Sequence, residues 1–372
     1  MRDLIYGELI LNENGQFSSF PFASEQSENI DKFAFEDRLR FQVQRVPRRA
    51  SQGCRIAIDQ DAHLATGLIG EVHNRSELAA ELGDEYVTAS DARVMLSLYK
   101  KYGLQLASKV NGLFSLAVFD WKQDKLVLLQ DRFSSPDSLF WATQAGRLTF
   151  STDVRLVARY SDLKADVDVL ALKYFLVFSF VPNERTLFAG IRKLRPERAL
   201  ICKGGKVSVQ RIRFPRLKGR RCRRDPDGLV SDYLSLMRRS VERRVKNTNG
   251  EIGFALSAGY DTNLTLLLAS DYLQRPIHVF CVGTNEAHHE IHRQREIVRR
   301  LHPYASSHEY LIAGREILYL PEIIHEFVDV LRLLTGKWKR TELTVLVENE
   351  FTIYQSSHLA PHSHHALRRR AV

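Results

Sequence analysis

Four residues of the stretch ALSAGYDTNL, namely Ser257, Gly259, Asp261 and Thr262, have types and spacing that could bind a phosphate group. Such a site needs backbone N–H groups that point at the anion, a helix N-terminus that faces it, and no side chain in the way. Gly259 leaves the backbone open, Ser257 and Thr262 carry hydroxyl donors, and Asp261 could cap the helix or help to place a magnesium ion. An ordinary turn between a strand and a helix has the same composition, so the motif alone leaves both interpretations open.

The segments around this turn predict strands that alternate with helices. The strand-like segments are EIGFAL, PIHVFCVG and SSHEYLI, and the helix-like segments are NLTLLLASDYL and EIHRQREIVRRLH. Upstream of them, GLVSDYLSLMRRSVERRVK has apolar residues on one side of a helix, including Leu229, Tyr233 and Leu234. Alternating strands and helices are typical of a parallel, doubly wound sheet.

The first half of the chain reads as β-rich. GLFSLAVFDWKQDKLVLLQD consists of two apolar runs around a polar turn, and ERALICKGGKVSVQRI predicts a second hairpin that turns at Gly204 and Gly205. SDARVMLSLYKKYG has apolar residues at helical spacing, with Ser90 and Asp91 placed to cap the helix. We expect an α+β layered domain that ends near residue 160.

The composition is that of a globular protein with 372 residues, 44% hydrophobic and 26% charged, which is enough for two or three domains. The sequence has no run of eighteen apolar residues, which predicts no membrane span. The N-terminus lacks the pattern of a signal peptide, so we expect a cytoplasmic protein. The four cysteines are far apart and indicate neither a zinc site nor a disulfide framework.

The net charge of +10 raises the question of a nucleic-acid partner. Much of the excess lies in RIRFPRLKGRRCRRD, which favours a solvated linker over a loop that binds a polyanion. No basic face with interleaved aromatic residues is present, so nucleic acid is not expected as a partner. The histidines near the C-terminus have no acidic or cysteine neighbours, and we predict an unstructured tail there and no metal site.

The turn at residue 257 resembles the phosphate loop, or PP-loop, of the asparagine synthetase family, whose pattern is Ser-Gly-Gly-x-Asp-Ser. Ser257, Gly259 and Asp261 match, Thr262 keeps the hydroxyl, and Ala258 adds a methyl where the family has glycine. The segments GEVHNRSEL, SDARVMLSLYKKYG, VNGLFSLAVFDWKQDKLVLLQDRF and LTFSTDVRLV resemble the glutaminase half of this family, in the same order. FLVFSFVPNERTLFAGIRKLRP resembles the segment that joins the two halves, and the whole resemblance covers residues 1 to 328.

The resemblance implies a fold and a domain order. It implies an α+β N-terminal sandwich of antiparallel sheets between helices, like that of N-terminal-nucleophile hydrolases, and then an incomplete α/β parallel-sheet domain of the adenine nucleotide α-hydrolase type. The expected parts are a glutamine amidotransferase-like domain at 1–160, a connecting segment with the basic linker at 161–227, a truncated ATP-binding domain at 228–330 and a tail without resemblance at 331–372.

In this family the first half hydrolyses glutamine and releases ammonia, and the second half uses ATP and Mg²⁺ to activate a carboxylate as an acyl-adenylate that an amine attacks. The residues that would contact ATP are Leu256, Ser257, Ala258, Gly259, Asp261, Thr262 and Val282. The implied partners are therefore a nucleotide and a carboxylate substrate, and a homodimer is also among the expectations.

The glutaminase half departs from the family at its reactive positions. The family places a cysteine nucleophile with a free α-amine at the N-terminus, whereas Arg2 and Asp3 occupy those positions here. Its oxyanion site uses an Asn–Gly pair, whereas Ile69 precedes Gly70. Gly70 and Asp91, which matches the residue that holds the substrate amine, are the remnant of a glutamine site. We expect no catalytic residue here, and so a retained fold without glutaminase activity.

The resemblance fades after residue 330, where the family continues into a second loop and further reactive residues. We therefore expect an amide-forming ligase of impaired activity. One alternative is a natural-product ligase similar to lasso-peptide cyclases, whose first half also lacks the cysteine. Another is a non-catalytic remnant or binding protein.

Overall fold

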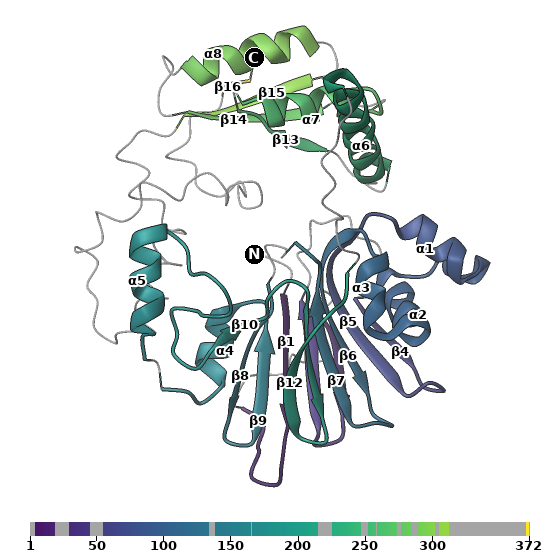
Figure 1. Cartoon of the computed structure of the whole chain (residues 1–372), viewed down its shortest axis with the longest axis vertical. Coiled ribbons are helices and arrows are strands. Elements are labelled where there is room, and N and C mark those ends of the chain that lie inside the picture. Colours follow the sequence, from purple (N-terminus) through teal and green to yellow (C-terminus); the bar gives the residue numbers. More distant parts are fainter. Residues whose placement is uncertain are drawn as a thin grey trace. The chain divides into compact units, whose positions relative to one another are not determined.

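The computed structural model of the chain divides into two compact units. The first contains the described residues up to 214, and the second contains those from 225 onward. The structure describes residues 4–18, 30–44, 55–133, 138–164, 166–214, 225–246, 252–257, 259–273, 277–283, 289–301, 305–311 and 370–371. Within these ranges, no helix is both long and apolar enough to cross a membrane. Figure 1 labels the elements of both units.

The first unit is built on two six-stranded sheets in which every described pair of strands is antiparallel. The first sheet has the order β10 (Arg192–Lys193), β8 (Phe140–Gln144), β9 (Arg147–Ser151), β1 (Leu4–Ile10), β3 (Leu39–Gln44), β2 (Ile30–Phe35). The second has the order β12 (Lys206–Arg211), β11 (Arg198–Lys203), β7 (Lys125–Gln130), β6 (Gly112–Asp120), β5 (Leu64–Val72), β4 (Ile56–Asp59). The antiparallel sheets expected for this half are confirmed.

The hairpins explain how the chain builds these sheets. β6 and β7 pair around the polar turn that the sequence predicts, with Asp120 opposite Lys125. β11 and β12 turn at Gly204 and Gly205, which have φ angles of 53° and 75°. Positive φ at both central residues is the requirement of the tight turn whose twist matches that of the strands, and glycine adopts it readily.

A core of alternating side chains fills the space between the two sheets. Ile5, Leu9 and Phe41 from the first sheet belong to the same buried cluster as Ile69 and Phe119 from the second. Successive side chains of a strand point to opposite faces of the sheet, so every second side chain faces away from this core. On the second sheet, these outward-facing side chains pack against helices.

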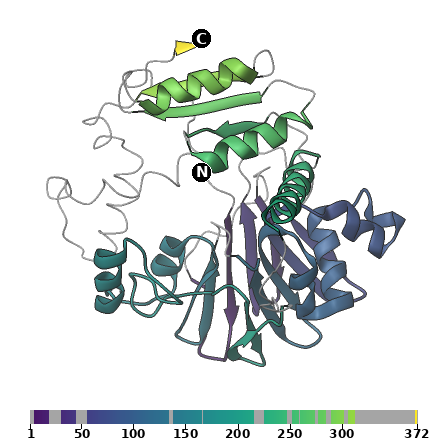
Figure 2. The ribbon, with the colours of Figure 1, turned by 45° about the horizontal axis from the view of Figure 1, so that its top comes forward.

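The helices α1 (Arg75–Leu82), α2 (Asp91–Tyr102) and α3 (Leu106–Lys109) cover the second sheet and are the blue helices of Figures 1 and 2. Two short 3-10 turns, Asp84–Tyr86 and Gly103–Gln105, lie between them. The Ser90 hydroxyl accepts a hydrogen bond from the Arg93 N–H, so the expected cap of α2 is confirmed.

The residues expected to connect two domains contribute to the first unit. β10, β11 and β12 lie in the stretch 161–214 and extend both sheets. α4 (Val154–Tyr160) packs against the first sheet through Val157, in one cluster with Ala142 and Phe188. α5 (Val169–Phe178) is followed by its C-cap residue Ser179, whose φ of 60° is left-handed, ahead of Pro182. The first unit is thus layered, with helices on the outer face of both sheets.

The second unit alternates strands and helices around a four-stranded sheet. Its elements are α6 (Pro226–Lys246), β13 (Gly253–Ala255), α7 (Tyr260–Ser270), β14 (Ile277–Gly283), α8 (His289–Leu301), β15 (Ala305–Leu311) and β16 (Arg370–Ala371). β13, β14 and β15 pair in parallel, and β16 pairs antiparallel with β15. β16 comes from the tail, where the sequence predicts no element. The other tail residues lie outside the described ranges.

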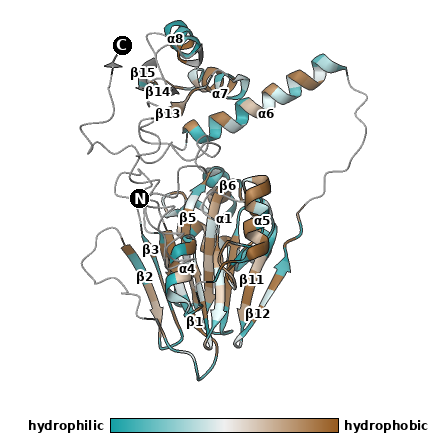
Figure 3. Ribbon diagram, turned by 90° about the vertical axis from the view of Figure 1, so that its left-hand side faces the viewer, coloured by the Kyte–Doolittle hydropathy of each residue, from teal (hydrophilic) through white to brown (hydrophobic). Residues whose placement is uncertain are grey.

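Two helices expose apolar side chains. α5 is coloured as hydrophobic over most of its length in Figure 3, yet only Ala171 of its residues is buried. On α6, Val241 and Val245 pack into the core of the second unit, whereas Leu229 and Tyr233, expected on the packed side of this helix, are exposed. Helical periodicity identifies an apolar side, but the neighbouring elements decide how much of that side is buried.

Candidate functional site

The turn at residue 257 joins the end of β13 to the start of α7. Leu256 is buried, and its N–H donates to the Phe280 carbonyl at 2.9 Å, which extends the pairing with β14 by one bond. α7 begins at Tyr260, and Gly259 is its N-cap residue without any capping side chain. Asp261 lies inside the first helical turn and is exposed, so it does not cap the helix.

The two hydroxyl residues of the turn bond to each other and to the backbone. The Ser257 and Thr262 hydroxyl oxygens are 3.0 Å apart, and the Ser257 N–H donates to the Thr262 hydroxyl at 3.2 Å. The Gly259 N–H donates to the Ser257 hydroxyl at 3.1 Å. These bonds close the turn into a compact ring, and the hydroxyls would have to rotate to reach a ligand.

The N-terminus of α7 is the part of this turn that remains open to an anion. The first N–H groups of a helix have no partner within the helix, and the helix dipole favours negative charge near them. Because Gly259, the N-cap residue, supplies no capping side chain, the N–H groups in the first turn of α7 are available as donors within the part of the chain that the structure describes. A β-carbon built on Gly259 would approach the Ser257 hydroxyl to 3.2 Å, so a larger side chain would crowd the same space.

Asn263 is a residue of this turn that the sequence reasoning missed. Its amide nitrogen donates to the Gly259 carbonyl at 2.6 Å and to the Ser257 carbonyl at 3.2 Å, which holds the turn against the helix. Among the described residues, its buried amide oxygen has no hydrogen-bond partner. An asparagine in the first turn of a helix after a hydroxyl residue is the signal that could have identified it.

Two predicted nucleotide contacts, Ala258 and the side chain of Val282, lie outside the described part of the chain. The backbone of Val282 belongs to β14, where it pairs with Tyr310 of β15. Leu256, Ser257, Gly259, Asp261 and Thr262 are therefore the predicted residues that the structure brings together in one turn.

The turn fits a phosphate group better than it fits a metal ion alone. Donor N–H groups and a helix N-terminus suit an anion, and the exposed carboxylate of Asp261 is the one acidic side chain in the first turn of α7. Among the described residues, no group of three or more His, Cys, Asp or Glu side chains could hold a metal ion. A Mg²⁺ ion here would need phosphate oxygens as further ligands.

The two residues predicted as the remnant of a glutamine site lie in the first unit, Gly70 on β5 and Asp91 at the start of α2. Gly70 has a φ of +97°, and a β-carbon there would come within 2.0 Å of the Leu113 carbonyl oxygen. Ile69 beside it is fully buried in the core between the sheets. An isoleucine side chain in that core supplies no hydrogen-bond donor to an oxyanion. Arg2 and Asp3 lie outside the described residues.

Asp91 is already paired with a cation of the same chain. The Arg75 Nε donates to the Asp91 carboxylate at 3.0 Å, and the Arg75 Nη1 donates to the Val87 carbonyl at 2.9 Å. Burial raises the pKa of Asp91 above its ordinary value, although Arg75 and Arg55 lower it. The carboxylate of Asp91 is therefore held in an ion pair within the chain.

Arg55 is a second residue of this region that the sequence reasoning missed. Only 4% of its surface is exposed, and its Nη1 donates to the Gly70 carbonyl at 2.8 Å. Its own N–H donates to the Asp31 carboxylate at 2.8 Å. Arg55 thus places a buried positive charge close to both Gly70 and Asp91, which no local sequence pattern indicates.

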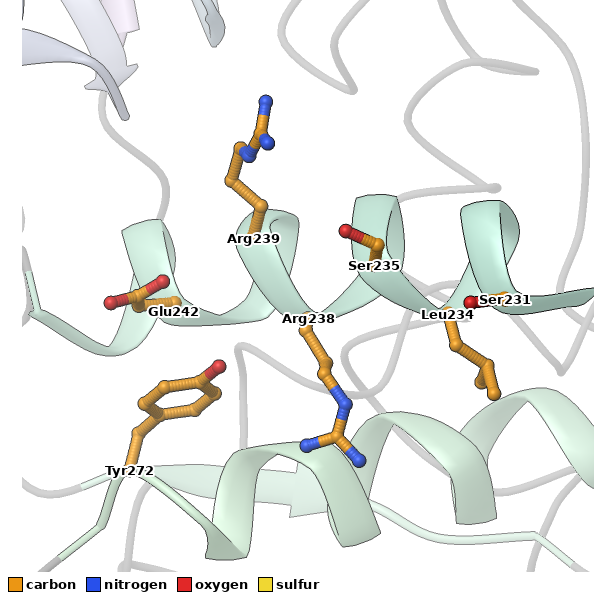
Figure 4. A pocket seen from close by; sticks show the side chains of 7 residues that line it. All are labelled: Ser231, Leu234, Ser235, Arg238, Arg239, Glu242 and Tyr272. Carbon is orange, nitrogen blue, oxygen red and sulfur yellow. The ribbon is translucent and has the colours of Figure 1, made fainter. Parts of the chain in front are cut away.

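A separate hollow of about 470 Å³ lies beside α6 in the second unit. Figure 4 shows Arg238 pointing toward α7, where its Nη1 is 2.5 Å from the Asp271 carboxylate, while Arg239 points away from α7. The other residues that line the hollow are Ser231, Leu234, Ser235, Glu242 and Tyr272. None of the residues predicted from the sequence to bind a ligand lines this hollow.

Comparisons with known proteins agree with the two-part organisation. A family model described as a glutamine amidotransferase domain matches residues 39–213, and one described as asparagine synthase matches residues 232–337. An asparagine synthetase (glutamine-hydrolyzing) 3 of Bacillus subtilis is 24% identical over 58% of this chain and 36% of its own length. A putative asparagine synthetase (glutamine-hydrolyzing) of Mycobacterium bovis is 24% identical over 77% of this chain and 47% of its own length.

The chain therefore spans between a third and a half of the length of these two relatives. A solved glutamine aminotransferase class-II domain protein of Silicibacter pomeroyi is 15% identical and covers 47% of this chain and 75% of its own, with a TM-score of 0.28. On the two family models and the curated relatives, this chain belongs to the asparagine synthetase-like family, with a glutamine amidotransferase N-terminal half.

Proposed function

We propose that this protein is an ATP-dependent amide-forming ligase whose second unit binds the phosphates of ATP at the turn Ser257–Thr262. The observation that carries the proposal is the uncapped N-terminus of α7 directly after β13, with Gly259 at the cap position. In such a ligase, the carboxylate attacks the α-phosphate of ATP and releases pyrophosphate, and an amine then attacks the acyl carbon of the resulting acyl-adenylate and releases AMP. The chain's own part is to hold the nucleotide: N–H groups of α7 would donate to phosphate oxygens, and Asp261 is the residue that would hold a Mg²⁺ ion, whose charge would offset that of the phosphates.

The amine in this proposal does not come from glutamine hydrolysed by the first unit. Ile69 supplies no oxyanion donor, and Arg75 neutralises the carboxylate of Asp91 that would hold the substrate amine. The test is incubation of the purified protein with glutamine. We expect no glutamate release above the uncatalysed background, and release that disappears in Asp91→Asn would contradict this part of the proposal.

The affinity for ATP should be weak in the protein alone. The Ser257 and Thr262 hydroxyls must give up their mutual bond before they can donate to a phosphate. Each hydrogen bond to a charged group adds about 1.5–3 kcal/mol before the cost of immobilising the ligand. Two or three such bonds correspond to a dissociation constant of millimolar order.

Calorimetric titration with Mg-ATP tests the proposal. Gly259→Val should abolish binding, because its side chain would enter the space beside the Ser257 hydroxyl. Asp261→Ala should weaken binding of Mg-ATP but not of metal-free ATP, because a carboxylate beside phosphates repels them unless a cation lies between. Ser270→Ala, at the other end of α7, is the matched control. Weak binding that is equal in all four proteins would mean that the stretch is only a turn.

A further inference from the structure

The first half of α6 carries an apolar stripe that is exposed in the described part of the second unit. Leu229, Tyr233 and Leu236 are spaced by four and three residues, so they lie on one side of the helix. Their exposed fractions are 43%, 53% and 63%. The buried residues of α6, Val241 and Val245, come from its last turns and, at about 3.6 residues per turn, from a different side. The core of this unit therefore does not use the stripe.

The spacing of this stripe is that of a coiled-coil seam. In a heptad written abcdefg, Tyr233 takes an a position, and Leu229 and Leu236 take d positions. Side chains at a and d insert between the side chains of a facing helix. The stripe therefore fits a second helix that has apolar residues at the same spacing.

Charged residues flank the stripe at intervals of seven residues. The g positions of the same heptads are Asp225, Asp232, Arg239 and Lys246, all of them exposed. Figure 4 shows Arg239 on the side of α6 that points away from α7. The order along the helix is acid, acid, base, base. In an antiparallel pair of helices g positions face g positions, so this order is complementary to its own copy.

We propose that two copies of this chain associate through α6 as an antiparallel pair with two-fold symmetry. Tyr233 of each copy packs on Leu236 of the other, which makes two apolar layers at the centre. Asp232 of each copy lies beside Arg239 of the other, which places an ion pair on either side of these layers. A two-fold interface must be complementary to itself, and this surface meets that condition. The interface uses none of the residues of the proposed nucleotide site.

The charges select the second copy and its direction. The Asp225 carboxylate already accepts a hydrogen bond from an N–H group in the first turn of α6, and Lys246 already pairs with Glu242 at 2.6 Å. The inner pair, Asp232 and Arg239, therefore carries the orientation. Exposed ion pairs contribute little affinity, so the two apolar layers supply most of it. We expect a dimer dissociation constant of about 10–100 µM.

Sedimentation velocity of the full chain over a range of concentrations measures this association. Asp232→Arg and Arg239→Asp each bring like charges together and should weaken the dimer roughly tenfold. The double variant reverses the pair and should restore most of the affinity. Leu236→Glu should abolish the dimer, because it buries a carboxylate in the apolar layer. Arg299→Asp, an equal change of charge at an exposed position of α8, is the matched control and should have no effect.

The substituted residues of α6 are exposed, so the variants should keep the fold, which circular dichroism verifies. The same series in a chain with Leu176 and Val177 replaced by glutamate separates α6 from association through α5. A chain that stays monomeric at every concentration overturns the proposal, because another occupant then covers the stripe. A dimer that Leu236→Glu leaves intact also overturns it. A double variant that dimerises no better than the two single variants overturns the antiparallel pairing.

Discussion

Gly70 shows how a residue can remain at a site for reasons of backbone geometry. Its φ of +97° is one that L side chains rarely adopt, and a β-carbon would come within 2.0 Å of the Leu113 carbonyl oxygen. Arg55, which is buried, also donates to the Gly70 carbonyl. The close pairing of β5 with β6 therefore needs glycine at this position for reasons of packing alone.

Replacing Gly70 with alanine should destabilise the first unit strongly. The cost combines backbone strain with a clash in the sheet, each about 1–3 kcal/mol, so we expect a loss of about 2–6 kcal/mol in the free energy of unfolding. Gly204→Ala is the control, because Gly204 also has a positive φ but has nothing within 4 Å of a built β-carbon. It should cost about 1–2 kcal/mol. Urea unfolding of both variants measures the difference, and equal losses would contradict the role of the Leu113 contact.

At the level of single elements, α5 begins at a charged cap. The Asp168 carboxylate accepts from the Ala171 N–H at 3.0 Å and from the Arg185 Nη1 at 2.6 Å. Burial raises the pKa of Asp168, but the hydrogen bonds from Ala171 and Arg185 outweigh burial, so the pKa lies below its ordinary value. A carboxyl group whose pKa is lowered by folding stabilises the fold above its unfolded pKa, and this contribution is lost as the pH falls through the folded pKa.

We therefore expect a pH-dependent effect of substitutions at Asp168. Asp168→Ala should lower the free energy of unfolding by about 1 kcal/mol at neutral pH and by less near pH 3. Asp168→Asn keeps a neutral capping oxygen and should lie between the two proteins. Urea unfolding at the two pH values measures both variants. The charge of Asp168 would have no role if Asp168→Ala lost the same amount at both.

At the scale of the whole molecule, α5 and the segment that follows it expose large apolar side chains. Val177 is 72% exposed, and Leu176, Phe178 and Phe180 are exposed as well. Contiguous exposed apolar residues on a folded protein mark an interaction site or lead to association. All four of these exposed residues belong to the first unit.

The exposed surface of α5 predicts association that depends on protein concentration. Replacing both Leu176 and Val177 with glutamate should lower light scattering and the binding of a hydrophobic dye, because it breaks the apolar surface with charge. Lys173→Glu is the matched control: it alters the charge of the same helix and removes none of these apolar side chains. If the unchanged protein stays monomeric and binds no dye over a wide concentration range, the prediction is wrong.

The sequence by itself determined the local elements, because their signals lie within a few residues of one another. Gly204 and Gly205 specify a tight hairpin, Ser90 caps α2, and the residues around Ser257 identify a strand-to-helix turn. The antiparallel pairing of the first unit follows from such hairpins and from the alternation of apolar residues.

Only the tertiary structure decided which polar groups meet across long separations in the chain. Arg75 pairs with Asp91 across 16 residues, and Gln294 reaches Leu256 across 38. The role of Asn263 follows no sequence motif, because its side-chain amide donates to backbone carbonyls of the turn. The sequence also did not predict which apolar residues of α5 and α6 are exposed, because helical periodicity identifies an apolar side but not the element that would cover it. Which polar groups become hydrogen-bond or ion-pair partners depends on how the elements pack, and no local sequence pattern encodes this packing.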